Sequence, residues 1–300
     1  KIINYPSNWN ISKKNITLPV KKINIDNPIV IKNRNLIINP GTEIIFSKNS
    51  YIYINNGNLI LNGSFEKPII LKGINKDYWG GIFVSNSDKS RIHNTTIKDT
   101  NFFNHENIML TGGVSFYKSN ISISNSRFVN SIAEDGLNFV NSTFNIKNSH
   151  LEDFNSDGID SDFSNGEINN VKFVNIFGDA LDLSGSKILI KDSLFNKIGD
   201  KAISNGEKSI TNINKIIIND AKFGIANKDE SLLEGSNIEI SNSSMYDIIS
   251  FNKKSYYDVP TMNLKKTVFD PNKVLIMKKN KAKINLNILN TTKFDPKALY

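Results

Sequence analysis

Acidic side chains recur at regular intervals in the middle of the chain, and their type and spacing could support chemistry. They lie in four related segments, EDGLN at 134–138, SDGID at 156–160, GDALD at 178–182 and GDKAIS at 199–204. Residues 133–207 contain 13 Asp and Glu against 6 Lys, a local charge of −7 in a chain whose net charge is +8. Closely spaced carboxylates can act as general acid and base, or can ligate a cation such as Ca²⁺.

An apolar column sets the period of these segments. Leu137, Ile159, Leu181, Ile203 and Ile225 stand 22 residues apart each time. Three further columns keep nearly the same spacing: Ile123, Ile146, Ile168 and Ile190; Phe128, Leu151, Phe173 and Phe195; and the polar column Asn125, Asn148, Asn170 and Asp192. A fixed period of about 20–25 residues is typical of a solenoid, in which each repeat buries its apolar face against its neighbours.

The pattern inside each repeat indicates strands. Ile, Val and Phe alternate with Ser, Asn and Lys, and a period of two is the period of a β-strand. Three short strands and three turns account for one coil, with the Asn column at a turn. The sequence therefore predicts an all-β fold, a single-stranded right-handed parallel β-helix with about 22 residues per coil.

The repeat runs through most of the length, so we expect one elongated domain with a covered segment at each end. Residues 1–28 form the predicted N-terminal lead-in or cap, residues 29–265 the β-helix, and residues 266–300 the C-terminal strands or cap. Caps are expected because an uncovered end of a β-helix is an exposed sheet edge, which invites pairing with other chains.

Composition excludes several classes of function. The absence of cysteine removes disulfides, thiol catalysis and cysteine-based zinc sites. Three histidines, His93, His105 and His150, form no spaced pair, so we expect no histidine metal site. No apolar run approaches the roughly 18 residues of a membrane span. The positive charge outside residues 133–207 is scattered and forms no basic-aromatic groove, so we expect no nucleic-acid partner.

Strand alternation places the candidate site residues. If Ile159 and Leu181 point inward, Asp160 and Asp182 point outward, and Asp162 follows them on the same face. Adjacent coils lie about 4.8 Å apart, so these charges repel one another, and they raise a pKa, find lysine partners or bind a cation. The predicted metal ligands are Asp160, Asp162 and Asp182, with Ca²⁺ as the candidate ion.

The remaining candidates surround this face. We predict catalytic roles for Asp157, Asp160, Asp179, Asp182, Lys201 and Lys228. We predict substrate contacts from Asp162, Asp200, Glu207, Asp229 and Lys254. Another interpretation applies to the acids at the turn entering each strand, namely Asp135, Asp157, Asp179 and Asp200. These residues could cap turns by accepting backbone N–H groups, with Lys201 and Lys228 neutralising them.

Several motifs together carry a resemblance to known proteins. The segments LTGGVSFYKSNISISNSRF, SDGIDSDFSNGEI, GDALDLSGS, GDKAISNGEKS, GIANKDES and FNKKSYYDVP resemble bacterial right-handed β-helix repeat proteins of the pectin-lyase-like fold. That family occurs alone or alongside atypical kinases of the spore-coat CotH type. The likeness covers roughly residues 30–265. It implies an exported protein that is secreted, periplasmic or attached to the cell surface.

A weaker resemblance is to polygalacturonases, whose acidic motifs lie on successive coils as SDGID, GDALD and GDKAIS do here. On that likeness Asp157 and Asp179 correspond to catalytic carboxylates. Gly178 stands where the family has a second acid of one pair, and Asp200 stands near the place of the family's histidine. The basic side chains that bind the substrate in that family have no counterpart in this sequence.

Three functions remain open on the sequence alone. The first is a carbohydrate-active enzyme, a hydrolase, lyase or epimerase, that uses the acidic face at residues 134–229 on a polysaccharide, which could itself be acidic. In a lyase, Lys201 or Lys228 would abstract a proton while Ca²⁺ neutralises a uronate carboxylate. The second is a non-catalytic β-helix of the cell envelope that binds glycans or a protein. The third is a structural scaffold in which the acids only stabilise turns.

Overall fold

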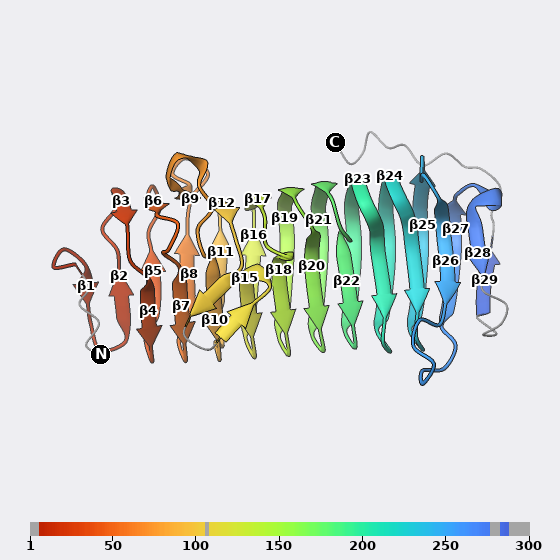
Figure 1. Cartoon of the computed structure of the whole chain (residues 1–300), viewed down its shortest axis with the longest axis horizontal. Coiled ribbons are helices and arrows are strands. Elements are labelled where there is room, and N and C mark those ends of the chain that lie inside the picture. Colours follow the sequence, from red (N-terminus) through yellow and green to blue (C-terminus); the bar gives the residue numbers. More distant parts are fainter. Residues whose placement is uncertain (1–5, 106–107, 277–282, 288–300) are drawn as a thin grey trace. The chain divides into compact units, whose positions relative to one another are not determined.

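The computed structural model describes residues 6–105, 108–276 and 283–287. The chain divides into two compact units, Lys1–Asn155 and Ser156–Tyr300. Both are built from strands, and the described helical residues are confined to two short 3₁₀ turns, η1 (Ile74–Lys76) and η2 (Pro271–Lys273) (Figure 1). The predicted all-β parallel β-helix is confirmed, with about 23 residues per turn.

The first unit stacks its strands in three parallel faces. One face contains β4 (Ile29–Lys32), β7 (Ile52–Asn55), β10 (Ile82–Ser85), β15 (Gly112–Tyr117) and β18 (Asp135–Val140). The second contains β2 (Asn15–Thr17), β5 (Asn35–Ile38), β8 (Leu59–Asn62), β11 (Ser90–His93), β16 (Asn120–Ser124) and the start of β19 (Thr143–Phe154). The third contains β3 (Lys22–Ile25), β6 (Glu43–Phe46), β9 (Ile69–Gly73), β12 (Thr95–Thr100), β17 (Arg127–Ser131) and the end of β19.

Two antiparallel pairs complete this unit. Strand β1 (Asn10–Ile11) pairs with β2, inside the predicted lead-in 1–28, whose residues 1–5 lie outside the described part. Strands β13 (Phe103–His105) and β14 (Ile108–Leu110) form a hairpin inserted between coils. Phe103 from this hairpin packs on Tyr51, Tyr53 and Phe83, with ring centroids 5.0–5.7 Å apart. Because Tyr53 and Phe83 face away from the coil interior, the hairpin gives them a second small core.

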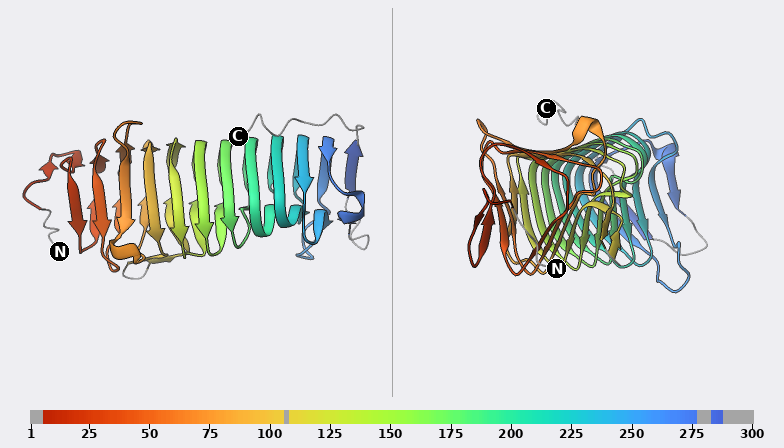
Figure 2. Two further views of the ribbon diagram at one scale, coloured as in Figure 1. Left: turned by 90° about the horizontal axis from the view of Figure 1, so that it is seen from above. Right: turned by 60° about the vertical axis from the view of Figure 1, so that its left-hand side comes forward.

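The second unit continues the same kind of coil with longer strands. Its strands are β20 (Asp157–Asp162), β21 (Asn165–Ile176), β22 (Leu181–Ser184), β23 (Lys187–Gly206), β24 (Ile210–Lys228), β25 (Leu232–Ser241), β26 (Tyr246–Phe251), β27 (Thr261–Val268), β28 (Val274–Ile276) and β29 (Lys283–Asn287). Within each unit the strands of a face lie behind one another when the stack is viewed obliquely from its end (Figure 2). Of the predicted closing segment 266–300, residues 277–282 and 288–300 lie outside the described residues.

The predicted inward columns form the core. In the second unit Ile159 pairs with Leu181, Leu181 with Ile203, and Ile203 with Ile225, and all four side chains are fully buried. The aromatic column continues as stacked rings, since Phe173 and Phe195 lie 4.7 Å apart. Burying each such side chain contributes about 1.5–3 kcal/mol, which explains why the spacing of 22 is kept.

The polar column lies at coil corners, as predicted. Asn125, Asn148, Asn170 and Asp192 all adopt positive φ, between 46° and 53°. Asn tolerates this left-handed conformation better than most residues. In the first unit the amide of Asn148 also donates to Oδ1 of Asn125 at 3.2 Å, so the corners form a ladder. Within the described residues no helix is long and apolar enough to cross a membrane.

Candidate functional site

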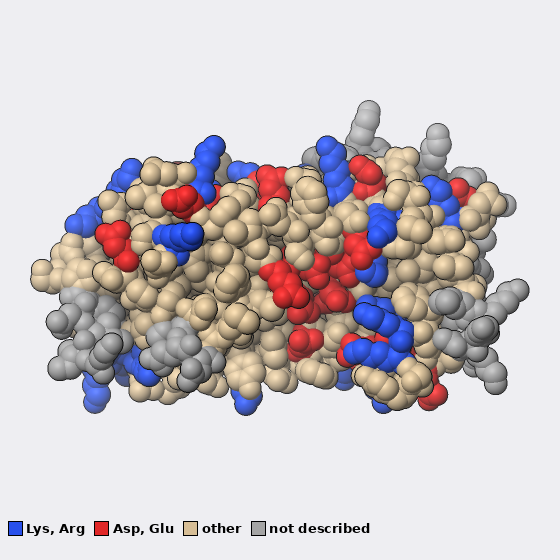
Figure 3. Space-filling view, in the orientation of Figure 1, with Lys and Arg blue, Asp and Glu red and all other residues tan. Residues whose placement is uncertain are grey.

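The outward column of the second unit carries the predicted acids. Asp160 pairs with Asp182, Asp182 with Ser204, and Ser204 with Ala226, in the register expected from the sequence. Asp162 stands two residues after Asp160 on β20 and therefore shares its face. Figure 3 shows the acidic side chains gathered over β20 and β22, with basic side chains beside them.

Lys228 is the cation nearest to the centre of this column. Its Nζ lies 3.7 Å from Oδ1 of Asp182, and its side chain is only 9% exposed. The amine reaches Asp182 because Gly206 leaves space beneath the lysine, where an added Cβ would lie 3.0 Å from Cε of Lys228. Among the described residues, Oδ1 of Asp182 and Oγ of Ser204 are buried without a hydrogen-bond partner. Both atoms are covered by neighbouring protein groups, so they lie beneath the accessible surface of the column.

Asp162 has an environment that favours its protonated form. Burial raises the pKa of this carboxyl, and the negative charges of Glu207 and Asp182 raise it further, while Lys254 opposes them. A carboxyl whose pKa is raised keeps its proton to a higher pH than a free aspartate does, which is the direction that a general acid requires. Asp162, predicted from the sequence to contact substrate, is therefore the candidate for that role.

Asp157, Asp179 and Lys201 form a second column at the start of these strands. Oδ1 of Asp157 accepts the backbone N–H of Asp179 at 2.8 Å, and Oδ1 of Asp179 accepts that of Lys201 at 2.9 Å. Each carboxylate therefore caps the next coil, which is the turn-capping role considered above. Asp200 does not continue the column, contrary to expectation, because Lys201 occupies the equivalent place and Asp200 precedes it by one residue.

Lys201 also forms ion pairs with two acids, Asp179 and Asp200. Its Nζ lies 2.9 Å from Asp179 and 2.6 Å from Asp200. Burial opposes the lysine charge, but attraction to Asp179 and hydrogen bonds to Asp200 and Asp179 outweigh it, so the pKa of Lys201 is raised. Burial raises the pKa of Asp179, Lys201 offsets part of this effect, and Asp182 adds to it. Lys201 thus fits the alternative interpretation, in which it neutralises the acids in its protonated form, and its catalytic role stays a prediction.

One group of carboxylates among the described residues has the spacing of metal ligands. Oxygens of Asp157, Asp179 and Asp182 lie within 4.8 Å of one another. The trio predicted from the sequence, Asp160, Asp162 and Asp182, shares only Asp182 with this group. The ammonium of Lys201 already contacts Asp179, so a cation there would compete with a resident positive charge. Ca²⁺ binding stays a prediction.

A loop after β26 reaches the edge of the acidic face. Asp229 accepts the backbone N–H groups of Lys253 and Lys254 at 2.6 and 2.8 Å, and it is almost fully buried. Its carboxylate therefore holds the loop in place. The loop in turn brings the Lys254 amine into a hydrogen bond with Glu207. Glu207 and Lys254, both predicted to contact substrate, thus pair with each other. Asp229 fixes the backbone of the loop that carries Lys254.

Ser204 holds the place in the outward column that its spacing of 22 from Asp182 predicts, whereas one contact of this site is not predicted from the sequence. Lys222, which lies 3.5 Å from Asp200, gave no signal because its partner stands outside the regular register.

Several solved structures are similar to this chain in their coil architecture. An alginate lyase from Paenibacillus sp. str. FPU-7 is similar with a TM-score of 0.56 and 12% identity, over 82% of this chain and 93% of that one. The shared feature is the fold. A PL6 family alginate lyase (TM-score 0.40, 13% identity, 90% and 50% of the two chains) and a GH87 α-1,3-glucanase catalytic domain in complex with nigerose (0.44, 12%, 85% and 64%) are also found. No family model and no curated protein matches the chain. The association with CotH-type kinases stays a prediction.

Proposed function

We propose that this protein is a carbohydrate-active enzyme that hydrolyses a polysaccharide at the outward column of its second unit. The observation that carries the proposal is the contrast between two neighbouring carboxyls. Burial and like charges favour the protonated form of Asp162, whereas Lys228 compensates the charge of Asp182. A carboxyl with a raised pKa beside a second carboxyl that has a positive partner is an arrangement suited to an acid and a base.

The separation of the two residues suits an inverting mechanism. Asp162 and Asp182 stand one coil apart and two residues apart along the strand. With about 4.8 Å between coils and about 3.3 Å per residue, their Cα atoms are roughly 8 Å apart. Side chains that leave these two positions in parallel would keep their carboxyl groups at a similar separation, and inverting hydrolases separate theirs by about 6.5–9.5 Å, which leaves room for the attacking water.

The chemistry then follows with each atom accounted for. Asp182 takes a proton from water as the water oxygen attacks the anomeric carbon. Asp162 gives its proton to the glycosidic oxygen as the bond between that oxygen and the anomeric carbon breaks. The Lys228 amine lies 3.7 Å from Asp182 and offers it a positive partner, and Asp160 lies beside Asp182 where it can accept hydrogen bonds from sugar hydroxyls.

Elimination chemistry has less support from the geometry. A lyase needs a neutral base beside the substrate, but Lys201 is held protonated by Asp179 and Asp200. The face is also rich in carboxylates, which repel a uronate unless a cation intervenes. Uncharged sugar units at the scissile bond fit the acidic face better. Export remains part of the proposal, which concerns polysaccharides of the cell envelope or the extracellular space.

The experiment is an assay of the full chain on a panel of neutral and acidic polysaccharides, read both as reducing ends and as unsaturated-uronate absorbance. We expect reducing ends without unsaturated products. Asp182→Asn should lower the rate by about 10²-fold or more, the usual contribution of a positioned base. Asp220→Asn, an exposed acid on β24, is the matched control and should leave the rate unchanged.

Two results would overturn the proposal. One is unsaturated product, which would assign a lyase. The other is binding of a panel glycan with no turnover by the wild type, which would assign the non-catalytic alternative. Thermal unfolding of each variant separates loss of chemistry from loss of fold.

A further inference from the structure

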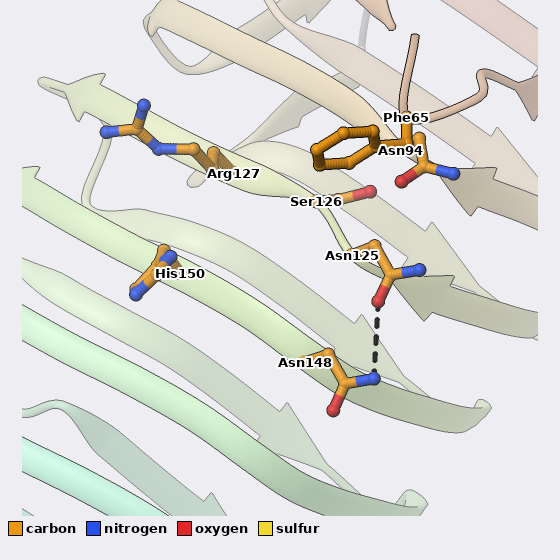
Figure 4. Close-up of a pocket in the computed structure, with 7 residues that line it drawn as sticks. All are labelled: Phe65, Asn94, Asn125, Ser126, Arg127, Asn148 and His150. Atoms are coloured by element: carbon orange, nitrogen blue, oxygen red, sulfur yellow. Dashed lines mark hydrogen bonds between the residues drawn. The ribbon is translucent and has the colours of Figure 1, made fainter. Parts of the chain in front are cut away.

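A groove in the first unit has no part in the chemistry described above. It has a volume of about 500 Å³ and is lined by Phe65, Asn94, Asn125, Ser126, Arg127, Asn148 and His150. Figure 4 shows the three asparagines following one another along one side, with the Phe65 ring above them and His150 across the groove. The lining contains an aromatic ring, amide groups and two basic side chains, and no acid.

Phe65 is exposed to solvent because it lies on a short, hydrogen-bonded turn that projects from the coil. Gly63 stands at the coil corner where Asn94 stands one coil later, and a Cβ there would lie 2.2 Å from the carbonyl oxygen of Asn94. The chain leaves the stack after this glycine and turns at once, because the N–H of Ser64 donates to the carbonyl of Lys67 and the N–H of Lys67 donates to Oγ of Ser64. The Phe65 side chain at the tip is 89% exposed.

A large apolar ring on a hydrogen-bonded turn is costly to leave in water and is already in position for a ligand. It offers a flat face of the kind on which the apolar face of a sugar ring can stack. The hydrogen bonds of the turn limit the ordering cost of binding, which otherwise reduces affinity.

The polar side chains of the groove complement such a ligand. The corner residues Asn94, Asn125 and Asn148 carry amides that can both donate and accept. Arg127 donates to Glu152, yet its side chain remains 55% exposed, and a guanidinium has five N–H donors. His150 lies on the coil after Arg127 at the paired position. The guanidinium donors of Arg127 that Glu152 does not use, with the His150 ring beside them, favour an anionic ligand.

We propose that this groove is a glycan-binding subsite for a sugar unit that carries a carboxylate, with Phe65 as the stacking face and Arg127 as the carboxylate partner. It is independent of the hydrolytic site.

The test is calorimetric titration of the full chain with a tetragalacturonate, its carboxyl-reduced neutral analogue and a sulfated tetrasaccharide. We expect the tetragalacturonate to bind and the neutral analogue to bind at least tenfold more weakly. Phe65→Ala and Arg127→Gln should each weaken binding about tenfold. Phe177→Ala, an exposed phenylalanine of the second unit, and Arg91→Gln, an exposed arginine on β11, are the matched controls and should bind as the wild type does.

Several outcomes would contradict the subsite. Absence of binding at millimolar concentration would do so, as would equal binding of the neutral analogue or tighter binding of the sulfated one. Equal loss in the control variants would also count against it. Asp182→Asn should bind the tetragalacturonate normally, so failure of the hydrolytic proposal would leave this result unaffected, and the reverse also holds.

Discussion

The same outward position of the repeat carries aromatic rings in the first unit and carboxylates in the second. Tyr53 pairs with Phe83 on β7 and β10, whereas Asp160 pairs with Asp182 on β20 and β22. The backbone has the same arrangement in both places, because each strand is short and pairs in parallel with the equivalent strand of the next coil. The side chains of this column are therefore free to differ while the inward columns keep the fold.

The groups that cover this outward column determine whether its side chains are buried or accessible to a ligand. In the first unit the hairpin β13–β14 brings Phe103 over the rings and excludes water from them. In the second unit the acids are compensated by Lys228 and by the loop that holds Lys254, and Asp160, Asp162 and Asp182 stay partly exposed. An outward column thus becomes either additional core or a polar surface on which a ligand can be bound.

Placing an acid in the covered column should break the first unit. Phe83→Asp removes a ring that stacks on Tyr53 at 5.2 Å and leaves a carboxylate beneath the hairpin. We expect a loss of about 4 kcal/mol in the free energy of unfolding, since large-to-small changes in cores and unpaired buried charges both act here. Urea unfolding measures it, with the exposed position Phe65→Asp as a control expected within about 0.5 kcal/mol of wild type. Near-equal stability of the two variants would refute the covered-core interpretation.

Removing a lysine from the acidic face should have a smaller effect. Lys201→Met leaves Asp179, which is almost fully buried, beside Asp182 without its cation. We expect a loss of about 2 kcal/mol, below the 3–5 of a fully buried pair because the lysine is partly exposed. Lys222→Met removes an exposed contact to Asp200 and should cost no more than about 0.5 kcal/mol. If the two variants lose equal stability, Lys201 is not the structural partner of Asp179.

Neutralising Asp162 should have the smallest effect on stability, and in the opposite direction. Its pKa is raised in the folded state, so the fold binds this proton more tightly than the unfolded chain does. Stability due to this group therefore falls as pH rises from about 4 through the raised pKa. Asp162→Asn should be as stable as wild type or more stable at pH 7, by less than about 1 kcal/mol.

The pH dependence provides the check on that variant. In thermal unfolding across the acidic range, the stability of Asp162→Asn relative to the wild type should increase as pH rises from about 4 through the raised pKa of Asp162. Asp220→Asn, which is exposed, should track the wild type. A variant that loses stability at neutral pH would show that Asp162 is needed as a charged turn residue instead.

Much of the second unit could be predicted because its period is fixed. A constant spacing of 22 determines which side chains share a column, and strand alternation determines which columns face inward. The burial of Ile203 and the alignment of Asp160 with Asp182 follow from these two facts. The left-handed corners at Asn125 and Asn148 follow from the conformational tolerance of asparagine.

Features outside the period could not be predicted in the same way. Asp229 holds the backbone of Lys253 and Lys254, but the loop after β26 has no counterpart in other coils. The cover over Phe83 depends on an inserted hairpin whose packing has no periodic signal. The misplacement of Asp200 was avoidable, since it stands three residues before Ile203 whereas Asp179 stands two before Leu181.

The most direct test of the central claim is the configuration of the first product at its anomeric carbon. Proton NMR of an early reaction mixture, using the polysaccharide that the wild type cleaves, distinguishes the two anomers before they equilibrate. Carboxyls on Asp162 and Asp182, with Cα atoms roughly 8 Å apart, predict inversion of configuration. A product with retained configuration, or one with an unsaturated end, would contradict the assignment of these two residues as acid and base.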